Sequence, residues 1–303
     1  MKVLLLRPPQ PLWPYINEYD NYLLPQSLVC LGAMLRENDF DVRLVDCMPL
    51  RIGWRKLADL LRREKPDVVG VSCNESMFSP EALRAIRLAK EVNPDVITIA
   101  GGVHFSNYLE DLKTEPLDFI VRWEGEYTLV ELLKEIEKPK PNLREVRGIA
   151  FCENGRIIET EPRPLIKDLD ELPLPAYDLL PLSEYGKARY LFSSGGITIH
   201  HSRGCPANCS FCVCWVQMGE HKICDGRIES HPRWRTKSVE RTIEEVELLV
   251  YKHKRKYLIF TDDTWNVDPK WNEKFANEVK KRGLEFKWFA FMRADYILRD
   301  ERL

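Results

Sequence analysis

The sequence lacks several features that would have placed the protein in other classes. No run of about 18 apolar residues occurs in the 303 residues, so no membrane-spanning helix is expected. The 45 basic side chains do not exceed the 47 acidic ones, and the net charge of −2 gives no footprint for nucleic acid. The apolar start at Met1–Leu6 is too short for a signal-peptide core. Internal repeats and low-complexity tracts are also lacking, and we expect a cytoplasmic protein.

The chain does have the length and apolar content for roughly two domains, since 44% of its residues are hydrophobic. It also contains nine cysteines. Because no secretion signal is recognised, these thiols predict a reducing compartment, where clustered cysteines indicate metal binding or catalysis rather than structural disulfides.

The first half alternates short apolar runs with amphipathic segments, the pattern of parallel βαβ units. The Asn154-Gly155 turn predicts an additional hairpin at the edge of the sheet. A Rossmann-like or flavodoxin-like domain is therefore expected over residues 1–160. The predicted strands are Val3–Leu6, Val42–Val45, Val68–Ser72, Val96–Ala100 and Leu117–Val121, followed by the hairpin strands Val146–Phe151 and Arg156–Glu159.

Ligands of such sheets bind beyond the carboxyl ends of the strands, at the topological switch point. The loops expected there are Ser72–Met77, Gly101–Ser106 and Trp123–Tyr127. Two adjacent glycines at the start of the second loop would let backbone approach a ligand closely. The same glycines could instead merely end a strand, and His104 could be a capping or packing residue.

The second half begins with a strap. Five prolines within residues 162–181 predict a stiff, extended linker, which we place at residues 161–190. Residues 191–303 then predict the first part of a (β/α) barrel, in which eight strands would be a full complement. We expect an unpaired third strand, and either a longer protein or a second chain that completes the barrel. The predicted elements are strands Gly196–His201, Lys256–Phe260 and Glu285–Phe291, and helices Ser238–Tyr251 and Pro269–Arg282.

The strongest chemical signal is the segment from Cys205 to Cys212, which has the spacing C-x-x-x-C-x-x-C. Three thiolates on one loop can each bind one iron of a cubane cluster and leave the fourth iron open for a substrate. Two other interpretations of the spacing stay open: a zinc site, with Cys214 or His221 as the fourth ligand, and a disulfide loop. The loop follows the first barrel strand, and such barrels carry their sites at the carboxyl ends of strands.

This spacing, with Gly204 before it and Phe211 before its last cysteine, resembles the radical S-adenosylmethionine (SAM) superfamily. The resemblance implies a [4Fe–4S] cluster on Cys205, Cys209 and Cys212, with an open iron that holds the amino and carboxylate groups of SAM. An electron from the cluster would cleave SAM to a 5′-deoxyadenosyl radical.

Three further segments resemble parts of the same core: Arg233–Glu240, Phe260–Trp265 and Arg293–Asp295. Acidic side chains near the ammonium group of SAM make chemical sense as charge-assisted acceptors, although strand-end caps are the alternative. The SAM contacts implied by the resemblance are Phe211, Asp262, Asp263 and Arg293.

The first half resembles the cobalamin-binding domain that precedes many radical SAM domains. The segments that carry this resemblance are Leu24–Asn38, Val42–Asp46, Ala100–Phe105, Trp123–Leu129 and the strap Ile166–Pro181. The implied cobalamin contacts are Ser72, Asn74, Gly101, Gly102, His104, Glu124, Gly125 and Glu126.

One expected feature of corrinoid proteins is missing. Many of them carry D-x-H-x-x-G, whose histidine ligates cobalt, whereas Cys47-Met48-Pro49 follows Asp46 here. The difference implies either cobalamin that is held without this lower ligand or no cobalamin.

The resemblance as a whole implies a cobalamin-dependent radical SAM enzyme that methylates an unactivated carbon of a small molecule or peptide. Its electron donor would be of the flavodoxin or ferredoxin type. Cyclisation of the kind performed by anaerobic magnesium-protoporphyrin IX monomethyl ester cyclases is the alternative within the family. A non-catalytic corrinoid- or cluster-binding module that needs a partner is the alternative from another class. The substrate and the catalytic residues are not predicted.

Overall fold

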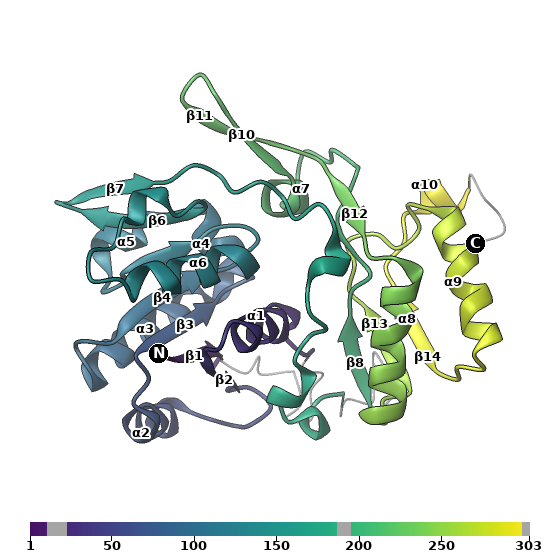
Figure 1. The fold of residues 1–303 in the computed structure, drawn as a ribbon, viewed down its shortest axis with the longest axis horizontal. Coiled ribbons are helices and arrows are strands. Elements are labelled where there is room, and N and C mark those ends of the chain that lie inside the picture. Colours follow the sequence, from purple (N-terminus) through teal and green to yellow (C-terminus); the bar gives the residue numbers. More distant parts are fainter. Residues whose placement is uncertain (11–22, 187–194, 299–303) are drawn as a thin grey trace.

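The computed structural model describes residues 1–10, 23–186 and 195–298. It contains two α/β parts with an extended strap between them, and a β-hairpin that projects from the second part (Figure 1). Among the described residues, no helix has both the length and the apolar character needed to cross a membrane.

The first part is built on a seven-stranded sheet with the order β2-β1-β3-β4-β5-β6-β7. Strands β1 to β5 are parallel, and β6 and β7 form an antiparallel hairpin at the edge, as predicted. The order 2-1-3-4-5 is that of flavodoxin-like folds, with the switch point between β1 and β3. The strands are β1 (Lys2–Arg7), β2 (Asp41–Asp46), β3 (Val68–Ser72), β4 (Ile97–Gly101), β5 (Phe119–Val121), β6 (Ile149–Glu153) and β7 (Arg156–Glu159).

Helices cover both faces of this sheet, which is why its parallel strands read as continuous apolar runs. The core on the α1 and α6 face continues into the second part, where Leu28 belongs to the same buried cluster as Ile197 and Leu258. The two parts therefore share one hydrophobic core. One face carries α1 (Gln26–Glu37) and α6 (Glu126–Ile136); the other carries α2 (Trp54–Glu64), α3 (Ser79–Val92), α4 (Val103–Asn107) and α5 (Asp111–Thr114).

The second part has a three-stranded parallel sheet with the order β14-β13-β8. The predicted cap is confirmed, since the Ser238 side chain accepts a hydrogen bond from the backbone N–H of Arg241 at 3.0 Å. Strand β14 pairs with β13 and with no other described strand, as expected for the third strand. The elements are β8 (Gly196–Ile199), α8 (Val239–Glu247), a π-helical turn (Leu248–Lys252), β13 (Tyr257–Phe260), α9 (Pro269–Lys281), β14 (Lys287–Ala290) and α10 (Ala294–Ile297).

Two antiparallel ladders between β8 and α8 were not predicted. One pairs β9 with β12, and the other is the projecting β10–β11 hairpin. The hairpin turns at Asp225 and Gly226, which both have positive φ (49° and 75°), as the tight turn favoured by the Asp-Gly pair requires. These elements are β9 (Ser202–Gly204), α7 (Cys214–Met218), β10 (Glu220–Cys224), β11 (Arg227–His231) and β12 (Trp234–Thr236).

The strap runs between the two parts as extended chain with short 3₁₀ turns, as its prolines predict. Its end at residue 190, and the domain boundary that follows, fall outside the described residues, so the predicted boundaries stay predictions.

Candidate cofactor site

The cysteine loop leaves the protein core at Gly204, the last residue of β9. This glycine has a φ of +79°, and a Cβ atom there would lie 2.2 Å from the carbonyl oxygen of Arg233. Only glycine fits this close approach of two strands. The loop therefore begins at a backbone position that is fixed by its pairing with β12.

The three loop cysteines are free thiols of intermediate exposure, so no disulfide joins them in the structure. The backbone N–H of Cys212 donates to the carbonyl of Cys209 at 3.0 Å, and the Trp215 indole N–H donates to the same carbonyl at 3.1 Å. Next to them, the N–H of Cys214 points at the Cys212 sulfur at 3.4 Å. The loop is folded so that its thiols remain available as ligands.

The zinc interpretation gains no support from this geometry. Within residues 1–10, 23–186 and 195–298, no three Cys, His, Asp or Glu side chains are grouped as ligands of a single ion. One of the two residues proposed as a fourth zinc ligand is engaged elsewhere. The ring of His221 stacks on Trp123, with 4.1 Å between their centroids.

A cubane cluster fits the donor set better than a single ion. Each sulfur would bind a different iron, so the three sulfurs need not converge on one point. A positive group is already near the loop, because Nη1 of Arg293 lies 3.6 Å from the sulfur of Cys209. Half-exposed thiols with a guanidinium beside them are suited to an anionic iron–sulfur centre.

The residues predicted to contact SAM fall into two groups. Phe211 is 91% exposed and Asp263 is also exposed, so both are available to a ligand beside the loop. Arg293 forms a two-pronged ion pair with Asp295 at 2.9 and 3.1 Å, in addition to its contact with the loop. Phe211 belongs to the cysteine loop and Arg293 contacts Cys209, and the role of all three residues as SAM contacts stays a prediction.

Asp262 is different, because it is 2% exposed and committed to the backbone before the cysteine loop. Its Oδ1 accepts hydrogen bonds from the N–H groups of His201 (3.0 Å) and Ser202 (2.5 Å) and from the Ser202 hydroxyl (2.6 Å). The His201 ring lies 2.8 Å from the same oxygen. Burial alone would raise the pKa of Asp262, but His201 and the other donors lower it to about 2. Asp262 thus fixes the chain that leads into β9.

The predicted cobalamin contacts on β3 and β4 lie together at the carboxyl edge of the sheet. Ser72 ends β3 and Gly101 ends β4 in neighbouring register. Gly102 has a φ of +97°, and a Cβ atom there would lie 2.5 Å from the carbonyl oxygen of Cys73 and 2.7 Å from Oδ1 of Asn74. This glycine is therefore required by the fold, whether or not it also approaches a ligand.

His104 lies beside the same edge, on α4. Its Nε2 atom is 3.2 Å from Oδ2 of Asp111, and its ring contacts the rings of Phe105 and Tyr108. It is the first histidine in the sequence, so the segment that follows Asp46 contains none. The Asp46 carboxylate is itself fully buried and binds Arg7.

The remaining predicted contacts, in the loop between β5 and α6, meet the second part of the chain. Glu124 accepts from Nη1 of Arg203 (2.8 Å), from Nη1 of Arg235 (2.9 Å) and from the backbone N–H of Ile166 in the strap (3.0 Å). Glu126 accepts from Nη2 of Arg203 at 2.5 Å. Both carboxylates are buried, so this loop joins the two parts, and its contact with cobalamin stays a prediction.

The charge state of this junction follows from its partners. Burial would raise the pKa of Glu124, but the two guanidinium groups outweigh it and lower the pKa. Gly125, between the two glutamates, packs against Leu31 of α1 and is the N-cap residue of α6.

Sequence reasoning missed Arg203 and the Trp123–His221 stack. Arg203 lies 79 residues from Glu124, and no local pattern couples the two. Trp123 has a positive φ of 58°, and the guanidinium of Arg122 lies 4.1 Å from its ring. The only available signal was the presence of two glutamates in a loop at the edge of an apolar sheet. Carboxylates buried there need partners, and this indicates that charged residues from elsewhere in the chain pair with them.

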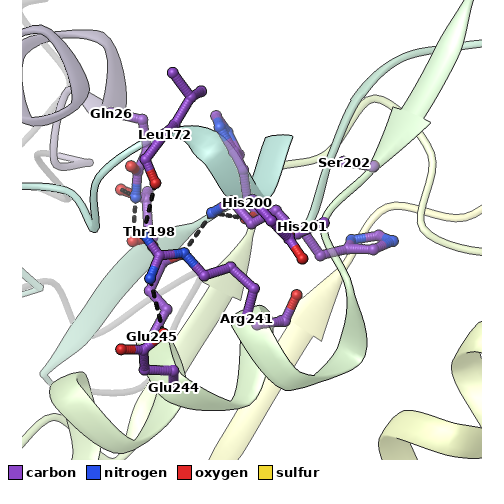
Figure 2. Close-up of polar contacts among 12 residues, drawn as sticks. Gln26, Leu172, Thr198, His200, His201, Ser202, Arg241, Glu244 and Glu245 are labelled. Carbon is purple, nitrogen blue, oxygen red and sulfur yellow. Dashed lines mark hydrogen bonds and ion pairs between the residues drawn. The ribbon is translucent and has the colours of Figure 1, made fainter. Parts of the chain in front are cut away.

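A second set of polar contacts joins α1, the strap and β8 (Figure 2). The Gln26 side-chain amide donates to the Thr198 carbonyl at 2.5 Å, and Arg241 donates to the Leu172 carbonyl of the strap at 2.5 Å. In the strap, the hydroxyl of Tyr177 donates to Glu245 at 2.6 Å. The cavity that remains under the strap is only about 20 Å³, room for a single water. This cavity is therefore too small to hold a corrinoid.

Two family models match the chain: the B12 binding domain over residues 12–133 and the radical SAM superfamily over residues 199–303. The two domains imply a [4Fe–4S] cluster, SAM and cobalamin.

Relatives and solved structures agree with the two models. An uncharacterised methyltransferase of Pyrococcus horikoshii is 33% identical over 273 residues, which are 89% of this chain and 55% of the relative. An anaerobic magnesium-protoporphyrin IX monomethyl ester cyclase of Rubrivivax gelatinosus is 31% identical over 287 residues, with coverages of 92% and 48%. The chain thus spans about half the length of these curated relatives.

The structure of the cobalamin-dependent S-adenosylmethionine radical enzyme OxsB, with aqua-cobalamin and S-adenosylmethionine bound, matches with a TM-score of 0.75 and 26% identity. The match covers 100% of this chain and 40% of that one. Both halves and their order are therefore accounted for, and the chain belongs to the B12-binding radical SAM family.

Proposed function

We propose that this chain carries the cofactor site of a radical SAM methyltransferase that moves a methyl group from cobalamin to an unactivated carbon. The observation that carries the proposal is the placement of three free thiols, Cys205, Cys209 and Cys212, on one half-exposed loop. This loop begins two residues after Arg203, whose guanidinium binds the first domain. The methyltransferase relative from Pyrococcus horikoshii supports the choice of reaction.

When bound, a [4Fe–4S] cluster with an open iron supplies reductive cleavage of SAM, and cobalamin supplies a carrier for the methyl group. The protein's own part is to hold and orient these groups. Cys205, Cys209 and Cys212 would hold the cluster, with Arg293 beside Cys209 to offset negative charge. Phe211 and Asp263, both exposed next to the loop, would contact SAM.

The reaction balances with two molecules of SAM and two electrons for each methyl group. One SAM gives up its methyl group and leaves as S-adenosylhomocysteine. The other is cleaved to methionine and 5′-deoxyadenosine, whose new hydrogen comes from the substrate carbon. A C–H bond is thereby replaced by a C–CH₃ bond, and the electrons come from a donor of the flavodoxin or ferredoxin type.

Cobalamin would bind without a histidine ligand from the segment after Asp46, which is Cys47-Met48-Pro49. His104 is the first histidine in the chain, and its Nε2 lies 3.2 Å from Asp111. The edge formed by Ser72, Asn74 and Gly101 is the site we favour, because flavodoxin-like sheets bind ligands at the carboxyl ends of their strands.

A second candidate is oxidative cyclisation, which the Rubrivivax gelatinosus relative favours. The product pattern separates the two. Methyl transfer yields S-adenosylhomocysteine and 5′-deoxyadenosine together, whereas cyclisation yields 5′-deoxyadenosine without stoichiometric S-adenosylhomocysteine. A third candidate, a non-catalytic module, would bind the cofactors and yield neither product.

The test is anaerobic reconstitution of the purified chain with iron, sulfide and hydroxocobalamin, followed by quantification of iron, sulfide and corrinoid. Reduced flavodoxin and SAM are then added, and the nucleoside products are measured. Bound cluster with both nucleosides is the expected result. Intact iron without any corrinoid would remove the methyl-transfer proposal, and zinc in place of iron and sulfide would remove the radical SAM chemistry of this chain.

A further inference from the structure

We propose that Glu124 is a positioning residue, which fixes the cysteine loop against the first domain by clamping two arginines that flank the loop. The inference deepens the proposed function and rests on it where the loop is taken to hold the cluster. The Arg203–Glu124–Arg235 contact, here called the arginine clamp, is assigned no role by the family matches.

The register of the β9–β12 ladder places the two arginines directly opposite each other, since Arg203 pairs with Arg235. Strand β9 leads into the cysteine loop. After this loop and the hairpin that follows it, the chain returns at β12 to pair with β9. Like charges directly across a ladder repel each other. A counter-ion shared by both arginines offsets this repulsion and stabilises the base of the loop.

Glu124 supplies that counter-ion with all its acceptor capacity engaged. Its Oε1 accepts from Arg203 at 2.8 Å and from Arg235 at 3.0 Å, and its Oε2 accepts from Arg235 at 2.9 Å and from the N–H of Ile166 at 3.0 Å. The Glu124 side chain is only 5% exposed, so water cannot replace these partners. One carboxylate thus joins the first sheet, the strap and both strands at the base of the loop.

Glu126 provides a matched comparison from the same loop. It is also buried and also binds Arg203, at 2.5 Å, but in the described part of the chain it forms no hydrogen bond or ion pair with Arg235. Loss of the Glu126 charge leaves each arginine with a carboxylate. Loss of the Glu124 charge leaves Arg235 without one, because its other acceptors are the carbonyls of Ile166 and Met218.

Trp123 keeps the Glu124 backbone in place during such a change. Its N–H donates to the Ser106 hydroxyl at 3.0 Å, and its ring stacks on His221 of the hairpin. A Glu124→Gln substitution therefore removes charge from the clamp while the loop that carries it stays anchored on both sides.

The experiment compares Glu124→Gln with Glu126→Gln by hydrogen exchange of the full chain, before and after cluster reconstitution. We expect exchange across residues 201–218 to be about tenfold or more faster in Glu124→Gln and less affected in Glu126→Gln, with α2 and α3 unchanged in both. In the reconstituted protein, Glu124→Gln should take up iron normally but lose it faster to a chelator. The electron paramagnetic resonance change that SAM produces in the reduced cluster should also be altered.

A rescue variant separates positioning from general destabilisation. Arg235→Gln combined with Glu124→Gln removes the excess charge and should recover much of the lost protection. Uniform acceleration throughout the chain, or no change over residues 201–218, would overturn the proposal. Exchange in the cluster-free chain tests the clamp by itself, so a wild-type chain that binds no cluster would overturn the proposed function and leave the clamp standing.

Discussion

The two ends of strand β9 have opposite surroundings. Within the strand, Ser202 binds the buried Asp262 and Arg203 belongs to the arginine clamp, so both residues are held by buried carboxylates. Beyond Gly204, the chain enters a loop with half-exposed thiols and with Phe211 at 91% exposure. The change from one environment to the other takes place within three residues.

This contrast separates the buried residues that position the cysteine loop from the exposed residues that would bind the cofactors. Buried charges with complete partners are costly to disturb and define one arrangement of the chain. Thiols and an aromatic ring at the surface remain accessible to a cofactor or a substrate. A preorganised cofactor site requires a strand held in one conformation, followed by a loop whose side chains are free to bind the cofactor.

The largest expected effect follows from the exposed side of the contrast. Cys209→Ala should abolish the cluster, so that iron falls from about four atoms per chain to near zero, because each thiolate binds a separate iron. Iron and sulfide analysis with the visible absorption spectrum measures this. Cys224→Ala, in the projecting hairpin, is the control and should bind iron like the wild type. An intact cluster in Cys209→Ala would contradict the ligand assignment.

A second comparison uses the adjacent glycines at the end of β4. Gly102→Ala should cost about 3 kcal/mol in unfolding free energy, because its φ is +97° and a Cβ would overlap the Cys73 carbonyl. Gly101→Ala meets only the Val121 carbonyl at 3.2 Å and should cost about 1 kcal/mol. Denaturant unfolding gives both values. Equal losses would show that the strain argument is wrong, and loss of corrinoid binding in Gly101→Ala alone would locate the ligand edge.

A third comparison uses two adjacent carboxylates. Asp262→Asn should lower the unfolding free energy by about 2 kcal/mol, because charge-assisted hydrogen bonds to the chain before β9 are lost. Asp263→Asn, at an exposed side chain, should stay within about 0.5 kcal/mol of the wild type. SAM affinity, measured by equilibrium binding to the reconstituted protein, should instead fall in Asp263→Asn. The reverse pattern would exchange the roles of the two residues.

The smallest expected effect concerns acid stability. Burial, with help from Arg122, lowers the pKa of His221 from 6.5 to about 4. The unfolded chain therefore binds the extra proton between these values, and stability falls as pH drops through this window. His221→Phe keeps a ring on Trp123 and removes this contribution, so the fall in melting temperature between about pH 7 and about pH 5 should be smaller. His231→Phe, at an exposed histidine of the same hairpin, should behave like the wild type.

Local patterns were sufficient where the structure depends on neighbours in sequence. The parallel strands, the Ser238 cap and the Asn154-Gly155 hairpin follow from apolar periodicity, capping chemistry and turn geometry. The β10–β11 hairpin was not predicted, although it has the same kind of turn. Asp225-Gly226 is an equally good turn signal, but the strands beside it carry many polar residues and no buried ones, and so lack an apolar stripe.

The arginine clamp could not be predicted in this way. Glu124 and Glu126 stand in a segment that resembles a cobalamin-binding motif, and nothing near them in sequence names Arg203 or Arg235 as partners. Their pairing arises only when the fold brings β9 and β12 beside the loop between β5 and α6. Likewise, Asp262 and Asp263 are chemically identical in the sequence, and only the packing of β13 decides which of them is buried.

The ladder between β9 and β12 has one further consequence. Gly204 and Trp234 are paired residues, so the chain departs at one of them and returns at the other. The thirty or so intervening residues form a loop whose ends are adjacent. The entropic cost of closing such a loop rises only slowly with its length. The whole loop between Gly204 and Trp234 could therefore be exchanged between homologues. Such an exchange would transfer the thiols and the hairpin and leave both sheets unchanged.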